Sequence, residues 1–233
     1  MTLLEIKSKL EEIRDRGWIK SLRKGTTGVG YTFESIFGVA ENNIPVADIG
    51  GRVEIKTVRK DSSSLITLFT FNKSVWKVSQ REIIERYGYI DNKGRLALKN
   101  TLFVGRDISQ GLTLYVDWHL NTVDLVDVQT EEVLAEWDVY VIVGKFMTKM
   151  SRLLFVLADR KTEDGVEYFH YNEAYLLSEP DSRAFLEAFE KGIIGIDLRM
   201  HIKENGSVRN RGTAFRVKEV YLKDLYRSVR RLL

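Results

Sequence analysis

The segment RLLFVLAD at residues 152–159 places a short, unbroken apolar run between an arginine and an aspartate. A run of this length that is bounded by charge is typical of a strand buried within a sheet. The segment EYFHYNEAYLL at 167–177 predicts a second strand that continues the same sheet. Because a sheet must bury its apolar surface against other elements, we expect the remaining segments to be arranged around this one.

Helices and strands alternate along the rest of the chain. Capping boxes that begin at Thr2 and Ser79 predict helices that end at Gly17 and Gly88. Further strands are expected as a tight pair at 46–58 and at 65–71, 96–104, 111–118, 122–128 and 193–202; further helices are expected at about 32–37, 137–148, 181–191 and from about Tyr221 to the end, with Arg227, Arg230 and Arg231 on a solvated face. The pattern predicts a mixed α/β (α+β) fold with interleaved strands and helices around a central sheet.

Composition limits the class of protein without identifying it. The absence of cysteine excludes disulfides, thiolate chemistry and the usual zinc-finger ligand sets. No apolar stretch reaches the roughly 18 residues of a membrane-spanning helix, and the charged N-terminus does not resemble a secretory signal, so we expect a cytoplasmic protein. A net charge of +3 permits a local basic cleft but does not by itself indicate nucleic-acid binding.

The segment DIGGRVEIK at residues 48–56 carries the strongest chemical pattern. Side chains alternate along a strand, so Glu54 and Lys56 face one side while Ile55 faces the core. Asp48 lies across the Gly50-Gly51 turn, from where its carboxylate can approach that of Glu54.

This arrangement predicts a Mg²⁺ site that cleaves phosphodiesters. Carboxylate oxygens of Asp48 and Glu54, with the carbonyl of Ile55, are the hard ligands that Mg²⁺ prefers alongside water and phosphate. Lys56 would lie within reach of the attacking water or the scissile phosphate, where it would neutralise developing charge. The alternative is that these residues form only the solvated face of a hairpin, since the spacing alone is common.

Several segments together resemble the MvaI/BcnI family of type II restriction endonucleases and, more distantly, the mismatch-repair nicking enzyme MutH. They occur in the same order as in that family and cover the chain from about residue 20. These segments are GTTGVGYTFESIFGVAENNIP at 25–45, DIGGRVEIKT at 48–57, LITLFTF at 65–71, LLFVLAD at 153–159, EYFHY at 167–171 and RNRGTAFR at 209–216. The resemblance implies a restriction-endonuclease-like central sheet flanked by helices, together with a recognition lobe.

The resemblance also assigns catalytic roles. Asp48 and Glu54 match the metal-binding carboxylates of the PD-(D/E)xK motif, and Lys56 matches its lysine. Glu34 corresponds to an additional glutamate of the family's active site, which would orient a metal-bound water or Lys56; the alternative is a solvated helix residue. The chain departs from a literal Pro-Asp pair, because Val46-Ala47 separate Pro45 from Asp48.

Two segments are expected to contact DNA. The glycine-rich stretch at 25–31 lacks the sequence of a nucleotide-binding loop, and its backbone N–H groups are expected to meet a DNA phosphate, although an ordinary loop before a helix is the alternative. Arginine and asparagine after the turn at 204–207 suit base reading in the major groove, against the alternative of a solvated hairpin. The predicted DNA-binding residues are Lys24, Thr26, Thr27, Arg209, Asn210, Arg211, Thr213 and Arg216.

Arg211 occupies a position where members of the family often have a histidine. Arginine keeps a hydrogen-bond donor there but loses the neutral acceptor of histidine. A relative's target sequence therefore cannot be transferred to this chain.

The function implied by the resemblance is cleavage of double-stranded DNA at a short, pseudosymmetric, GC-rich site, with Mg²⁺ or, as a substitute, Mn²⁺. A monomer would nick the two strands in succession, with a catalytic lobe at about 1–110 plus part of the later sheet and a recognition lobe at about 111–220. A DNA methyltransferase would be its functional partner. The alternatives are a MutH-like nicking or repair enzyme, a catalytically inactive DNA-binding module, and a metal-independent enzyme unrelated to DNA.

Overall fold

A computed structural model describes residues 1–39, 48–71 and 75–233. The chain forms two compact units, each assembled from separate stretches of sequence. The first comprises residues 1–66, 147–181 and 222–233, and the second comprises residues 67–146 and 182–221. Residues 67–110, which we had expected in the lobe that holds the N-terminus, lie in the second unit.

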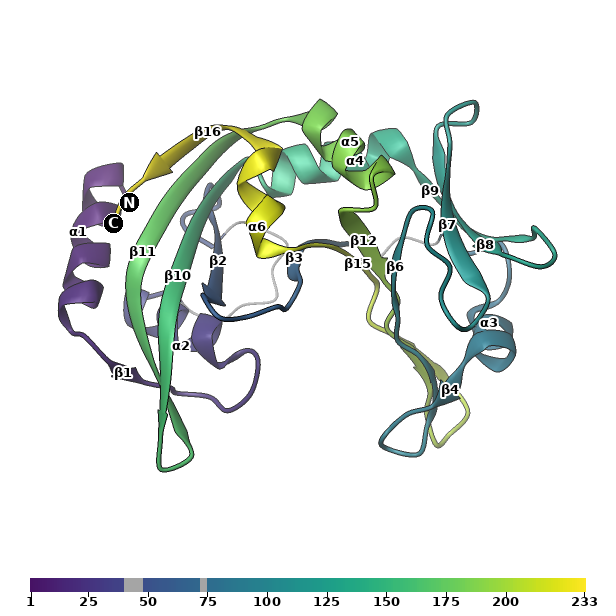
Figure 1. The fold of residues 1–233 in the computed structure, drawn as a ribbon, viewed down its shortest axis with the longest axis horizontal. Helices are drawn as coiled ribbons and strands as arrows, with labels where there is room; N and C mark the ends of the chain where they lie inside the picture. The colour runs from purple at the N-terminus through teal and green to yellow at the C-terminus, as the bar shows by residue number, and fades with distance from the viewer. Residues whose placement is uncertain (40–47, 72–74) are drawn as a thin grey trace. The chain divides into compact units, whose positions relative to one another are not determined.

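The first unit is built on a mixed sheet in the order β1-β11-β10-β2, with β16 also paired to β11. Only β2 and β10 run parallel; the other neighbours are antiparallel. The two long strands β10 and β11 lie side by side in Figure 1. The elements are α1 (Leu3–Asp15), β1 (Ile19–Lys20), α2 (Gly28–Phe37), β2 (Glu54–Arg59), β10 (Arg152–Glu163), β11 (Val166–Pro180), η1 (Lys223–Leu225) and β16 (Tyr226–Arg231).

The core of this unit lies between α1, α2 and one face of the sheet. Apolar residues of α1 recur at helical spacing, and they pack with Phe33 and Phe37 of α2 against alternate residues of the strands. Ile55 of β2 points into this core beside Leu154 and Val156 of β10. The predicted buried strand at 152–159 is therefore confirmed, because consecutive side chains of β10 are buried from residue 153 to residue 158.

The second unit contains three small sheets, in the orders β3-β15-β12-β6, β14-β13-β5-β4 and β7-β8-β9. Stacked and tilted ring contacts join its helices to the first of these sheets; they involve Phe69, Phe146, Phe185, Phe189 and Phe215. The strands are β3 (Ile66–Phe71), β4 (Tyr89–Ile90), β5 (Leu96–Leu98), β6 (Thr101–Phe103), β7 (Leu112–Asp117), β8 (Thr122–Asp127), β9 (Val133–Asp138), β12 (Ile194–Asp197), β13 (Met200–Ile202), β14 (Val208–Asn210) and β15 (Thr213–Val217). The helices are α3 (Gln80–Tyr87), α4 (Val139–Lys149), which ends in the first unit, α5 (Ser182–Glu190) and α6 (Glu219–Leu222).

Local signals predicted most helices correctly. The Thr2–Glu5 capping box is present, with both reciprocal hydrogen bonds, and the Ser79 hydroxyl accepts from the backbone of Glu82. Helix α2 ends at Gly38 as expected, because its φ of 85° suits glycine, but the helix begins four residues earlier than predicted. The segments 96–104 and 193–202 each form two strands in place of one, and β9 was missed.

The expected C-terminal helix from about Tyr221 is wrong. Helix α6 ends at Leu222, one turn of 3₁₀-helix follows, and residues 226–231 form β16. Because β1 pairs with only a short part of β11, the later edge of β11 offers unpaired backbone groups, and β16 binds there. The three arginines expected on a helix face are carried by this strand, and Leu232 beyond it packs into the core. Tertiary pairing thus overrides the local pattern.

No helix in the described part of the chain is long and apolar enough to cross a membrane.

A buried carboxylate stabilises the hairpin between β8 and β9. Asp127 accepts hydrogen bonds from the Tyr87 hydroxyl at 2.5 Å and from the backbone of Gln129 and Thr130. The bond from Tyr87, followed by those from the backbone, lowers the pKa of Asp127 to about 2. The resulting stability is present above the ordinary aspartate pKa and is lost as the pH falls through the value in the folded protein.

We therefore expect the melting temperature of the protein to fall steeply between about pH 4 and pH 2. The variant Asp127→Asn should melt lower than the wild type at pH 6 and show a shallower decline over that window. Thermal melts at a series of pH values test this expectation. Equal pH slopes in the two proteins would show that the carboxylate does not supply this stability.

Candidate functional site

The chemically important segment lies at the free edge of the five-stranded sheet. Among the described residues, strand β2 pairs with β10 and with no second strand, and a tight turn leads into it. Ile49 and Val53 form an isolated antiparallel bridge across this turn, and Gly50 and Gly51 have φ values of 56° and 70° that glycine adopts without strain. The predicted turn is thus present, although Pro45 and Val46-Ala47 lie outside the described residues.

The turn brings Asp48 to the open edge of β2. Its Oδ2 accepts a hydrogen bond of 2.7 Å from the backbone N–H of Ile55. The N–H and C=O groups of one strand residue point to the same side, so the Ile55 carbonyl also faces the open edge. Burial raises the pKa of Asp48 and the negative charge of Glu54 adds to this effect, while the bond from Ile55 opposes it.

Glu54 is the buried centre of the site. Its side chain is 6% exposed, and each of its carboxylate oxygens meets an ammonium group. Lys56 Nζ lies 2.7 Å from Oε1, as the shared strand face predicted. Lys149 Nζ lies 2.8 Å from Oε2, and sequence reasoning missed it because no local pattern relates the end of α4 to a strand about a hundred residues earlier.

The donor set at this edge fits a hard divalent cation. Within residues 1–39, 48–71 and 75–233, no three His, Cys, Asp or Glu side chains gather into a metal site. Asp48 and Glu54 nevertheless supply carboxylates beside the edge-facing carbonyl of Ile55. Mg²⁺ is commonly bound through one or two carboxylates, with water and substrate phosphate completing its shell. A site completed in this way needs no third acidic side chain.

Glu34 lies half-buried on α2, which packs against β2. The glutamate is therefore carried by an element that adjoins the candidate catalytic strand. Its proposed role in orienting a water or Lys56 stays a prediction.

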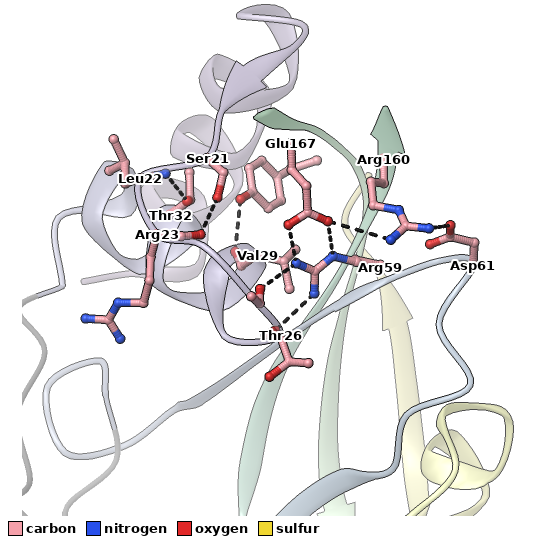
Figure 2. A network of polar contacts seen from close by, with 12 residues as sticks. Ser21, Leu22, Arg23, Thr26, Val29, Thr32, Arg59, Asp61, Arg160 and Glu167 are labelled. Atoms are coloured by element: carbon pink, nitrogen blue, oxygen red, sulfur yellow. Dashed lines mark hydrogen bonds and ion pairs between the residues drawn. The ribbon is translucent and has the colours of Figure 1, made fainter. Parts of the chain in front are cut away.

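Arg59, at the end of β2, fastens the glycine-rich loop to the candidate catalytic strand. Figure 2 shows its guanidinium between the carboxylate of Glu167 and the loop. It donates to the carbonyls of Gly25 and Thr26 at 2.9 and 3.0 Å, and to the two oxygens of Glu167 at 3.1 and 2.8 Å. Arginine is suited to this position because its planar fork makes several directed bonds at once.

These contacts also fix the direction of the loop's N–H groups. In a trans peptide the carbonyl of one residue and the N–H of the next point in opposite directions, and the described chain contains no cis peptide. Because Arg59 binds the carbonyls of Gly25 and Thr26, the N–H groups of Thr26 and Thr27 point away from it. The N–H groups of Thr26 and Thr27 are therefore free of Arg59 and can be directed at a DNA phosphate, as predicted.

A groove of about 800 Å³ lies beside this loop. Arg160 is ion-paired with Asp61 and Glu167, whereas Lys20 and Lys24 have no ionic partner among the described residues. Arg23 stacks on the ring of Tyr31 at 3.6 Å. The lining residues are Lys20, Ser21, Leu22, Arg23, Lys24, Gly25, Thr26, Arg59, Asp61, Ser62, Ser64, Arg160, Gly165, Val166 and Glu167. Of these, the sequence had indicated only the glycine-rich loop and Lys24.

Comparison with known proteins decides the family. The sequence model of the MvaI/BcnI restriction endonuclease family matches residues 7–226.

The chain belongs to that family.

This restriction endonuclease is therefore a site-specific deoxyribonuclease. Its structure is similar to that of restriction endonuclease MvaI in a complex with cognate DNA substrate, with a TM-score of 0.81, 25% identity and full coverage of both chains. The structure of MvaI in the absence of DNA matches with a TM-score of 0.56 and 25% identity, covering 100% of this chain and 99% of the other. The search of curated proteins found no match.

The second unit of the endonuclease contains a basic pocket of about 380 Å³. The side chains of Arg209 and Arg211 are exposed, and Arg211 lines the pocket, while its backbone N–H and carbonyl are hydrogen-bonded to Arg199. The lining residues are Lys93, Arg95, Lys99, Asp197, Leu198, Arg199, His201 and Arg211.

His201 brings an imidazole into this pocket beside Arg211. Burial, with the nearby charges of Arg95 and Lys99, lowers its pKa, which favours the neutral form of the ring. Its Nε2 lies 3.2 Å from Arg95, which can only donate. The pocket thus contains the imidazole that Arg211 itself does not provide.

Three of the other predicted DNA-binding residues have partners within the fold. The Asn210 amide bonds Gln80 and the backbone of Gly212, and Arg216 bonds Thr67 and pairs with Asp197 at 3.3 Å. Thr213 is only 3% exposed; its hydroxyl accepts from the Trp137 indole and donates to the carbonyl of Phe71. This buried position indicates that Thr213 contributes to the packing of the unit rather than to DNA contact.

The variant Thr213→Val is expected to lower the free energy of unfolding by about 1–3 kcal/mol, because the Trp137 N–H loses its buried acceptor. DNA affinity of the folded protein should not change. The variant Arg211→Ala should show the opposite combination, with unchanged stability and weaker binding. Chemical denaturation and gel-shift titration of both variants separate these roles. Weak DNA binding by a stable Thr213→Val protein would show that Thr213 contacts DNA after all.

Proposed function

We propose that this type II restriction enzyme hydrolyses phosphodiester bonds of double-stranded DNA with Mg²⁺, with Mn²⁺ as a substitute. The observation that supports this most strongly is the convergence of Asp48, Glu54 and the Ile55 carbonyl at one edge of β2, with Lys56 on Glu54. We assign catalysis to the first unit and base recognition to the second.

Each residue of the site has a proposed task. Asp48, Glu54 and the Ile55 carbonyl would hold the cation, which supplies Lewis-acid stabilisation of charge on the scissile phosphate. Lys56 would orient the attacking water and neutralise the negative charge that develops. Glu34 would fix the position of that water or of Lys56 from α2.

DNA would be bound chiefly through its phosphates in the first unit and through base edges in the second. The N–H groups of Thr26 and Thr27, with Lys24, would contact the backbone beside the groove. Arg209 and Arg211, with Asn210 and Arg216 behind them, would form the base-reading surface. The similar MvaI structure, which is a complex with cognate DNA substrate, supports the binding of DNA by this chain.

The described part of a single chain contains one such site, so we propose that a monomer nicks the two strands in succession at a short, pseudosymmetric sequence. A companion methyltransferase would then protect the host's own sites. On supercoiled plasmid, a restriction enzyme should produce nicked circles that convert to linear DNA and then to discrete fragments. Stable nicked circles would instead support a MutH-like nicking enzyme.

The variants Glu54→Gln and Lys56→Met are expected to lower the rate of plasmid cleavage by at least about a hundredfold, because each removes an electrostatic contribution at the reacting phosphate. Glu163→Gln, at an exposed hairpin residue of the same unit, is the matched control and should cleave normally. Gel-shift titration without metal should show that the inactive variants still bind DNA. Full activity in Glu54→Gln would overturn the metal assignment.

The role of the groove can be tested through the salt dependence of DNA binding. Replacing Lys24 by Gln should reduce the slope of log K against log salt by about one, because one phosphate contact is lost. Lys7→Gln, on the exposed face of α1, removes an equal charge and should leave the slope unchanged. Equal slopes for the wild type and Lys24→Gln would remove Lys24 from the DNA contacts.

A further inference from the structure

Lys149 lies at the centre of the candidate site although the PD-(D/E)xK pattern does not include it. It is the last residue of α4, and its Nζ lies 2.8 Å from Glu54 Oε2. Lys149 and Lys56 are each only 24% exposed, and the carboxylate between them is nearly inaccessible. A contact this enclosed has little competition from water, unlike an ion pair at the surface.

Around Glu54, the described residues include one further carboxylate and two ammonium groups. Asp48 and Glu54 contribute two potential negative charges, and Lys56 and Lys149 contribute two positive charges that act on Asp48 as well. Among the described residues, the Tyr226 hydroxyl also senses the charge of Glu54; burial, and then this charge, raise its pKa, so the hydroxyl adds no charge of its own. A divalent cation that binds beside both ammonium groups would add positive charge to an enclosed site that already contains two cations, which is costly.

The two lysines differ in how readily each can leave Glu54. Lys56 follows Glu54 by two residues on one strand, so its side chain stays on the same face. Lys149 reaches Glu54 from the end of a helix, by a flexible four-carbon stem. Its displacement therefore requires rotation of one side chain and no movement of β2.

We propose that Lys149 is a positioning residue that holds Glu54 in the metal-free enzyme and competes with the divalent cation for its Oε2. A bound DNA phosphate adds negative charge and gives the displaced ammonium a new partner. Cation binding is thereby weak in the free enzyme and is strengthened by DNA. This inference rests on the proposed metal-dependent function.

The test is Mn²⁺ binding to the full chain without DNA, followed by the electron paramagnetic resonance signal of the free ion. Lys149→Met should bind Mn²⁺ about tenfold more tightly than the wild type, because one repulsive unit charge is removed from a partly buried site. Lys149→Arg retains the charge and should remain near the wild type. Lys7→Met, which removes the same charge from an exposed pair with Glu11, is the matched control and should not change the affinity.

Thermal melts supply a second readout and a check on folding. Without Mn²⁺, Lys149→Met should melt lower than the wild type, because Glu54 keeps only one cationic partner; added Mn²⁺ should raise its melting temperature by more than it raises that of the wild type. Lys149→Gln carries the same expectations should the methionine variant fail to fold. Adding Glu54→Gln to Lys149→Met should abolish the gain in affinity.

The outcomes separate this inference from the function beneath it. Equal Mn²⁺ affinity in Lys149→Met and the wild type, or weaker binding in the variant, would overturn competition by Lys149 while leaving the metal site in place. Absence of Mn²⁺ binding in all of the variants, with or without an uncleaved duplex, would overturn both the metal site and the role of Lys149.

Discussion

The parallel pairing of β2 with β10 is the contact on which the rest of the structure depends. It buries Ile55 beside Leu154 and thereby sets Glu54 and Lys56 on the opposite face of the sheet. At the other edge of β2, Asp48 accepts a hydrogen bond from the Ile55 N–H, and the Ile55 carbonyl is directed toward the same side. A slip of one residue in this register would exchange the core and chemical faces of the strand.

Parallel strands cannot be joined by a tight turn, and the long connection between these two has a structural use. The chain leaves the first unit after Ile66, builds most of the second unit, and returns at Met147 in time to place Lys149 at Glu54. The return path therefore places a second ammonium group, that of Lys149, on Glu54. The same long-range pairing explains the network around Arg59, since its partner Glu167 lies on β11 and the loop that it binds precedes α2.

Sequence predicted the parts of this site that local geometry determines. Asp48, Glu54 and Lys56 fall within nine residues, so strand alternation and one glycine turn were sufficient to bring them together. Lys149 and the Arg59–Glu167 pair could not be predicted in this way, because only the tertiary fold makes these residues neighbours. Thr213 illustrates the opposite difficulty. It is a polar residue in a motif expected to bind DNA, but its hydroxyl is buried and accepts a hydrogen bond from the Trp137 indole. The C-terminal strand was missed because its own sequence carries no strand pattern. Its conformation is determined by pairing with the edge of β11.

The interleaving of the two units along the chain affects how they can be exchanged between relatives. The second unit is made of residues 67–146 and 182–221, with β10 and β11 of the first unit between them in sequence. No single contiguous fragment contains all of it, so exchanging the whole second unit between relatives requires two coordinated segment exchanges. The four junctions would have to preserve the strand register of the host sheet at Ile66, Met147, Asp181 and Leu222. Exchange of the second unit is therefore constrained by the fold of the first unit, although the two units are compact in themselves.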